Sequence, residues 1–132
     1  MELRFAHLAD YATAGERGKL TIVGIFEVVG ASPQRPIPLP PFHLVGSFQA
    51  HLPEGSDHEL EIRVVNADGG ELARATIPMK FSPTLQKRLE APFAIGMVGM
   101  NVPDVGDYAF HLFVDGQHRG AVPLQVVPAP PT

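Results

Sequence analysis

Residues 104–127 read DVGDYAFHLFVDGQHRGAVPLQVV, and this stretch decides the fold class. Over 108–114 an apolar side chain recurs at every second position, which is the period of a half-buried β-strand. Asp115-Gly116 separates this run from a second apolar run. Asp-Gly between two such runs is typical of a tight turn between antiparallel strands, so the sequence predicts a β-hairpin here.

Further segments of the chain have strand-like patterning and are separated by turn residues. They are 2–11, 19–29, 42–52, 58–66, 72–81 and 91–102. Pro78 lies inside a strand segment, which predicts a sheet edge or a bulge there, and Pro123 predicts that the last strand is also an edge. Together with the hairpin, the segments give about eight strands and predict a two-layer antiparallel β-sandwich.

One short helix is expected beside the strands. Ser82 can cap its N-terminus, Pro83 suits the first helical position, and two leucines follow one turn apart. At 132 residues the chain is large enough for one self-sufficient core. We therefore expect a single β-sandwich domain over 1–127, followed by a Pro-rich C-terminal tail over 128–132.

Residues 33–41, PQRPIPLPP, form a Pro-rich connection between two strand segments. Such a segment cannot donate a regular ladder of sheet hydrogen bonds and favours an extended conformation. Arg35, Pro38 and Pro41 have the spacing of an SH3-domain ligand. A stiff crossover between the two sheets is the favoured interpretation, because Pro-rich connections are common.

Composition limits the classes of partner. The net charge is −4 and the basic residues are scattered, which argues against a broad nucleic-acid surface. The chain has no Cys, which excludes disulfides and Cys-ligated metal sites. The first residues lack the apolar core of a signal peptide, and no apolar run approaches the ~20 residues of a membrane span. We therefore expect a soluble cytoplasmic protein without a nucleic-acid or membrane partner.

Three motifs carry a resemblance to a known family. Residues 8–12 read LADYA, 18–26 read GKLTIVGIF, and 106–116 read GDYAFHLFVDG. In this order they resemble an uncharacterised family of small bacterial proteins, in which ADYA is followed by GKLxIxGxF and then by GxYxFxLxVDG. The resemblance implies an all-β fold and brings no activity with it.

The approach to the hairpin carries a second resemblance. Asp104-x-Gly106-x-Tyr108 is similar to the corner of immunoglobulin-like sandwiches, where a Tyr hydroxyl bonds to upstream backbone. The expected fold is therefore all-β, a two-layer antiparallel immunoglobulin-like β-sandwich of about eight strands with one short helix.

No spacing of reactive side chains points to catalysis. The chain contains neither H-E-x-x-H nor G-x-S-x-G. His43 and His111 are both expected at outward positions of strands, and they are the pair to test for a shared metal ion. Isolated His residues remain the favoured interpretation. We therefore expect a protein that is not an enzyme and has no cofactor and no metal site.

Surplus apolar strand surface is the main functional signal. Burial of both faces within one chain and packing against a second chain explain it equally well. The interface hypothesis concerns Val23, Ile25, Val29, Met97, Val98 and Met100. It predicts a non-enzymatic module that acts through protein–protein contact or self-association, as a homo-oligomer or with a protein partner. The alternative is a small-ligand or carbohydrate-binding sandwich with contacts at Tyr11, His111 and Phe113, which the absence of Trp weakens.

Overall fold

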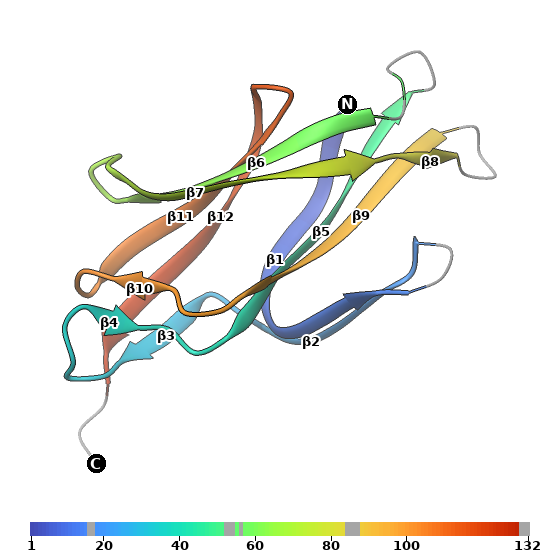
Figure 1. Cartoon of the computed structure of the whole chain (residues 1–132). Coiled ribbons are helices and arrows are strands. Elements are labelled where there is room, and N and C mark those ends of the chain that lie inside the picture. The colour runs from blue at the N-terminus through green and yellow to red at the C-terminus, as the bar shows by residue number, and fades with distance from the viewer. Residues whose placement is uncertain (16–17, 52–54, 56, 84–87, 130–132) are drawn as a thin grey trace.

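The computed structural model describes residues 1–15, 18–51, 55, 57–83 and 88–129. These residues form β-strands and turns, with no α-helix among them, which confirms the predicted all-β class (Figure 1). The strands are β1 (Glu2–Ala14), β2 (Leu20–Phe26), β3 (Val28–Ala31), β4 (Ile37–Pro38), β5 (Phe42–His51), β6 (Asp57–Asn66), β7 (Glu71–Lys80), β8 (Ser82–Pro83), β9 (Arg88–Met97), β10 (Asn101–Val102), β11 (Gly106–Val114) and β12 (Gln117–Pro128).

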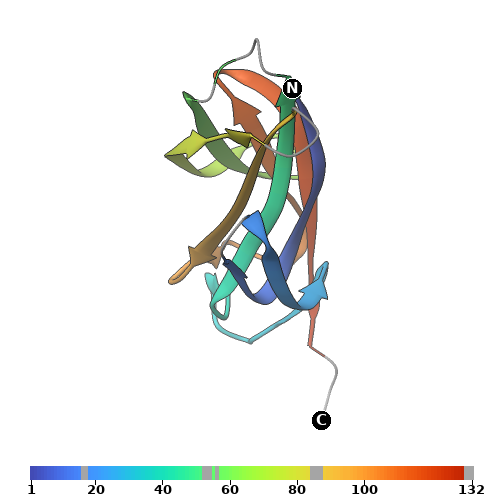
Figure 2. The ribbon, with the colours of Figure 1, turned by 90° about the vertical axis from the view of Figure 1, so that its right-hand side faces the viewer.

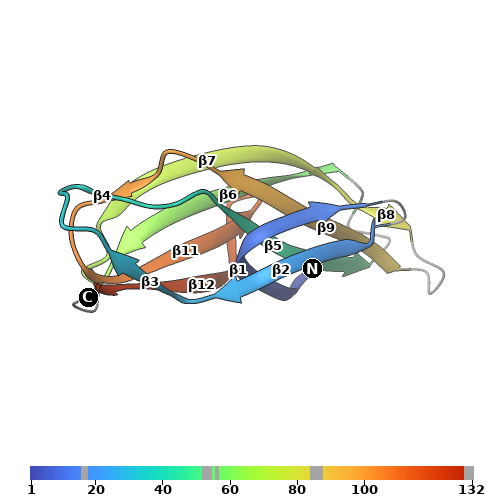
Figure 3. The same ribbon diagram turned by 90° about the horizontal axis from the view of Figure 1, so that it is seen from below.

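Two five-stranded sheets make up most of the molecule. The first sheet has the order β2-β1-β5-β9-β8, and the second sheet has the order β3-β12-β11-β6-β7. β4 and β10 form a separate two-stranded sheet, at the end of the molecule where β12 ends (Figure 1). All pairs are antiparallel except that β3 runs parallel to β12. The turned views show that both large sheets are twisted and curled (Figures 2 and 3).

The main core takes side chains from both five-stranded sheets. Phe42 of β5 meets Phe110 of β11 edge to face, with ring centroids 5.8 Å apart, so an aromatic contact joins the two sheets. Full burial of one large apolar side chain stabilises the folded state by about 1.5–3 kcal/mol. The largest fully buried members are Phe48, Phe110, Leu8, Ile37, Leu44, Leu60, Ile62, Leu112, Leu124, Val45, Val102 and Val114.

A second, smaller apolar cluster results from the curl of the first sheet. Val45 alternates with the core residue Leu44 along β5, so it points to the opposite face, yet it is fully buried. Its cluster contains Ala9 and Ala12 of β1, with Leu20, Ile22 and Ala94 packed against it. The hairpin of β1 and β2 therefore curls over the outer face of β5, so that this sheet has the form of a half-barrel.

The predicted strand over 19–29 is two strands that belong to different sheets. β2 pairs with β1 in the first sheet, and β3 pairs with β12 in the second. Glu27 lies between them, and its carbonyl oxygen accepts the Gln125 N–H at 2.7 Å. One continuous stretch of chain thus links the two sheets along one side of the molecule.

The hairpin of β11 and β12 forms as predicted. Asp115 and Gly116 have φ values of 50° and 83°, which is the positive-φ pair that a two-residue type I′ turn requires. The Tyr108 hydroxyl donates a hydrogen bond to the Asp104 carbonyl oxygen at 2.6 Å, as the resemblance to the corner motif predicted. Local sequence therefore determines both the turn and the start of β11.

Three local predictions were wrong. Ser82 begins β8 rather than a helix, and β8 pairs antiparallel with Leu89 and Glu90 of β9; residues 84–87 lie outside the described residues. The segment over 91–102 is divided between β9 and β10, so the chain has more strands than expected.

Pro123 does not mark an edge, because β12 lies between β3 and β11. β3 joins β12 only from Gln125 onward, so the missing N–H of Pro123 interrupts no ladder there.

Edge placement at Pro78 was correct, since β7 ends the second sheet. The C-terminal tail was expected to start at residue 128, but β12 includes Pro128 and pairs it with Ala31. Residues 130–132 of the predicted tail lie outside the described residues.

The Pro-rich connection packs against the molecule. Within it β4 pairs with β10, and the Leu39 N–H donates to the Met100 carbonyl oxygen at 2.9 Å. The Arg35 guanidinium bonds to the Asp104 carboxylate at 3.0 Å and to the Ser32 carbonyl oxygen at 2.8 Å. An SH3-type ligand presents its Arg to the partner, whereas this one is occupied within the chain, so the crossover interpretation fits better.

Candidate functional site

Three exposed apolar side chains lie together on the hairpin of β1 and β2. Tyr11, Val23 and Ile25 are 52%, 53% and 56% exposed. Tyr11 and Val23 lie directly opposite each other across β1 and β2, and Ile25 follows two residues further along β2. We refer to these three residues as the hairpin patch. A contiguous exposed apolar patch is typical of an interaction site.

His43 of β5 borders the hairpin patch. Its ring meets the Tyr11 ring at 5.3 Å between centroids, with an interplanar angle of 73°. Within the described part of the chain, its buried Nδ1 atom has no hydrogen-bond partner. Tyr11 therefore rests on another aromatic ring, which limits its mobility and pre-organises the patch.

The hairpin patch includes a sheet edge. β2 is the terminal strand of the first sheet, and its sequence LTIVGIF carries no charge. By contrast, the terminal strand β7 of the second sheet contains Glu71, Arg74, Lys80 and Pro78. Charges and Pro are the usual means by which edge strands avoid pairing with another chain. β2 lacks these features along its whole length.

The other residues of the predicted interface lie elsewhere. Val29, Met97 and Met100 are partly buried and pack against the main core. Val98 is 81% exposed and borders a shallow hollow of about 320 Å³. The hollow is lined by apolar side chains of β6, β7 and the end of β9, together with Arg74. The predicted interface is thus divided between the hairpin patch and this hollow.

His111 and His118 approach each other on the outer face of the second sheet. His111 Nδ1 lies 2.8 Å from His118 Nε2, and the Phe113 ring meets His118 edge to face at 5.2 Å. The Arg63 guanidinium lies over the Phe113 ring, 4.1 Å from its centroid. Burial, and then the neighbouring His118, lower the pKa of His111 below its usual value.

Ion pairs cover the adjacent part of the same face. Arg63 bonds to Glu61, and Arg74 bonds to Glu71 at 2.8 Å. The bond with Arg74 lowers the pKa of Glu71, and in return the bond with Glu71 raises the pKa of Arg74. These charges neutralise one another in pairs, so the face has no strong field of one sign.

The structure does not bring His43 and His111 together. His43 lies on β5 of the first sheet beside Tyr11, whereas His111 lies on β11 of the second sheet beside His118. In the described ranges, no group of three or more His, Asp or Glu side chains could hold a metal ion. The three contacts predicted for a small ligand or carbohydrate are also separated. Phe113 and His111 lie on β11 of the second sheet, whereas Tyr11 lies on β1 of the first sheet.

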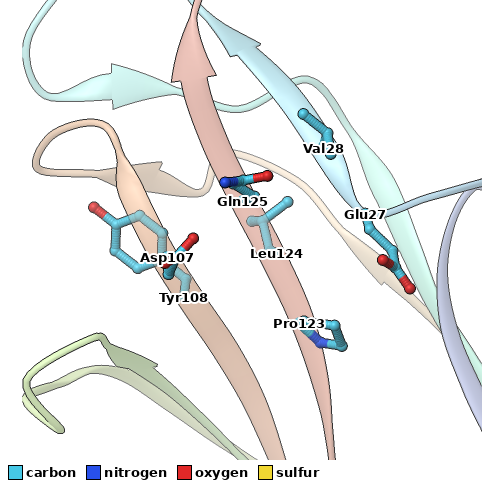
Figure 4. Close-up of a pocket in the computed structure, with 7 residues that line it drawn as sticks. All are labelled: Glu27, Val28, Asp107, Tyr108, Pro123, Leu124 and Gln125. Carbon is cyan, nitrogen blue, oxygen red and sulfur yellow. The ribbon is translucent and has the colours of Figure 1, made fainter.

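A second hollow, of about 270 Å³, lies over β12 between β3 and β11 (Figure 4). Its floor includes Pro123, Leu124 and Gln125, and the carboxylates of Glu27 and Asp107 stand on opposite sides of that strand (Figure 4). Among the described residues that line it, none is basic. The hollow is therefore a surface feature without a defined chemistry.

These features define an all-β protein in which two five-stranded sheets make up most of the molecule. A model of a family of unknown function, DUF6941, matches residues 4–127. The chain therefore belongs to this family, which confirms the resemblance drawn from its three motifs. No curated protein and no solved structure matches the chain. The described residues include no helix that is long and apolar enough to cross a membrane.

Proposed function

We propose that this protein is a non-enzymatic, cytoplasmic module that acts by protein contact, and that it self-associates through the hairpin patch and the edge of β2. The observation that carries the proposal is the grouping of Tyr11, Val23 and Ile25, each more than half exposed, on one hairpin. Packing within a single chain leaves these three side chains exposed to water, so a second surface is needed to cover them.

A second copy of the chain is the partner that best fits this edge. Two identical edge strands can pair antiparallel about a two-fold axis, because each offers the same pattern of N–H and C=O groups. Each copy carries a net charge of −4, so most approaches are opposed by like charge. β2 is uncharged, and two copies can meet there without that penalty.

The expected dimer is weak. Three side chains and one seven-residue edge strand offer less area than the roughly 800 Å² per partner of a standard stable interface. Association should therefore depend on concentration in the micromolar range and above.

Light scattering coupled to size-exclusion chromatography tests the proposal with a matched pair of variants. Ile25→Glu places a charge in the hairpin patch and, because the change occurs twice across a two-fold interface, should weaken the dimer by about 2 kcal/mol or more. Val98→Glu places the same charge on an exposed Val at the far hollow and should leave association unchanged. A wild-type chain that stays monomeric at all concentrations contradicts self-association and leaves only a foreign protein as partner.

The proposal includes a finer fold class, an immunoglobulin-like sandwich. The Tyr108–Asp104 hydrogen bond and the stretch of chain that moves from the first sheet to the second support it. The parallel pairing of β3 with β12 and the curl of the first sheet are departures from a regular antiparallel sandwich. An experimental structure in which the two sheets do not pack face to face would contradict this assignment.

Binding of a small apolar ligand is the second candidate function. The hollow beside Val98 supports it, because Met97 and Met100 give it an adaptable apolar lining and Arg74 adds one polar group. The carbohydrate form of this alternative loses support, since Tyr11 lies apart from His111 and Phe113. A screen for ligands that raise the unfolding temperature tests this candidate. In the variant Val98→Glu, such a ligand should no longer raise the unfolding temperature.

A further inference from the structure

Two histidine rings, those of His111 and His118, are in direct contact on neighbouring strands of the second sheet. Their facing nitrogens, Nδ1 and Nε2, are 2.8 Å apart, and their ring centroids are 5.0 Å apart. The hairpin register fixes this approach, because Phe113 pairs with His118 across β11 and β12. Two imidazoles on neighbouring strands are thereby held with nitrogen facing nitrogen.

We propose that His111 and His118 form a two-histidine binding site for a divalent late transition-metal ion, of the class of Cu²⁺, Ni²⁺ and Zn²⁺. Imidazole nitrogen is a favoured ligand for these ions, and His is the commonest metal ligand in proteins. At a site of this kind affinity follows the order of the first-row metals, so Cu²⁺ should bind most tightly.

Metal binding needs only a small rearrangement of the pair. With metal–nitrogen bonds of about 2.0–2.1 Å and a tetrahedral angle, the two nitrogens lie about 3.3 Å apart, roughly half an ångström beyond their present separation. Because the nitrogens face each other almost directly, the ion must enter by a tilt of one ring. His118 is exposed and can tilt, whereas the more buried His111 holds its place.

The proton that lies between the two rings can be replaced by one on the other nitrogen of the same ring, so the pair frees a nitrogen for the metal without a change in net charge. In the neutral pair one ring donates an N–H to the other, and the donor ring can instead carry its proton on its second nitrogen.

The surroundings determine how tightly the ion is held. Arg63 of β6 pairs with His111 in the sheet register, and its positive charge is offset by its bond to Glu61. Arg119 of β12 donates to the side chain of Gln117 and to the Met1 carbonyl oxygen. Since no cluster of three ligating side chains occurs in the described ranges, the remaining coordination positions are open to water or to a ligand from outside. Binding should therefore be reversible and moderate in strength.

Calorimetric titration of the tag-free full chain with Ni²⁺ and with Cu²⁺ tests the proposal. We expect one ion per wild-type chain, and a loss of affinity of roughly tenfold or more in His111→Gln and in His118→Gln. His43→Gln alters a histidine of the other sheet and should bind as the wild type does. Electron paramagnetic resonance of the Cu²⁺ complex should show two nitrogen ligands in the wild type and fewer in either variant.

Two results would overturn the site: a wild-type chain that binds neither ion, or binding that persists unchanged in the double variant His111→Gln/His118→Gln. His118 is exposed, so His118→Gln should fold even where the substitution at His111 disturbs the sheet. A thermal unfolding curve of each apo variant separates loss of a ligand from loss of the fold.

Discussion

His58 Nδ1 lies 2.5 Å from Asp115 Oδ2, and this contact ties β6 to the turn between β11 and β12. The His58 side chain is only 8% exposed, and its Nε2 atom lies 3.0 Å from the Gly55 carbonyl oxygen. A carboxylate and a carbonyl can only accept hydrogen bonds, so both ring nitrogens must carry a proton to satisfy them. The geometry therefore favours the imidazolium form of His58 in the folded state.

Loss of this ion pair should destabilise the hairpin turn. Asp115→Asn keeps a residue that tolerates the positive φ of 50° but removes the charge that faces His58. Asp115 is half exposed, so solvent screening limits the expected loss in the free energy of unfolding to about 1 kcal/mol. Urea unfolding measures it. Asp68→Asn, in the other Asp-Gly turn, is the matched control and should change the free energy by less than about 0.5 kcal/mol.

The same contact predicts how stability depends on pH. The hydrogen bond from His58, and then that from the Glu59 N–H, lower the pKa of Asp115 in the folded state. A carboxyl whose folded pKa is lowered adds stability above its unfolded value, about 3.9, and that stability is lost as the pH falls through the folded value. Urea midpoints measured from about pH 5 downward should fall less steeply for Asp115→Asn than for the wild type. Parallel curves for the two chains would contradict the lowered pKa.

Interactions between near neighbours were predictable from the sequence, whereas those between distant segments were not. Asp115-Gly116 defines a turn within four residues, and the turn then sets the register that brings His118 beside Phe113 and His111. Counting outward from this turn pairs His118 with Phe113, which places His111, two residues further along the same strand, near His118 and not near His43. The division of 19–29 between two sheets depends on β12, about 100 residues later, and the only local sign of it is Glu27 in an otherwise apolar run.

The error at Ser82 has the same origin. Its helix signals are local and weak, while the pairing of β8 with β9 places Leu89 in the core. Burial of one Leu contributes about 1.5–3 kcal/mol, more than a single helix cap contributes. Tertiary packing therefore overrode local propensity there. The hairpin patch was predictable in part, since Val23 and Ile25 were recognised as surplus apolar surface, but Tyr11 joins them only through the pairing of β1 with β2.

The hydroxyl of Tyr108 should be worth a measurable part of the stability. Tyr108→Phe removes the 2.6 Å bond to the Asp104 carbonyl oxygen and leaves the ring in the core, so we expect a loss of about 1 kcal/mol in urea unfolding. Tyr11→Phe is the control within the same chain, because Tyr11 is half exposed and its change should stay within about 0.5 kcal/mol. Equal effects of the two substitutions would show that the corner hydrogen bond contributes nothing to stability.

Gly24, between two residues of the hairpin patch, is required for two separable reasons. Its φ is 70°, and a Cβ at this position would overlap the Oδ2 atom of Asp10. Gly99 has a φ of 76° with open space where a Cβ would stand, so Gly99→Ala measures the backbone strain alone, roughly 1–2 kcal/mol. Gly24→Ala should lose more stability than Gly99→Ala, because the overlap adds to the strain.

A double-mutant cycle separates the two effects at Gly24. Asp10→Ala removes the overlapping carboxylate, so Asp10→Ala/Gly24→Ala should lose only about as much stability as Gly99→Ala does, relative to a chain with Asp10→Ala alone. Urea unfolding of the four chains gives the coupling energy between positions 10 and 24. A coupling energy near zero would mean that the Asp10 carboxylate does not press on Gly24, and the cost of Gly24→Ala would then come from the positive φ alone.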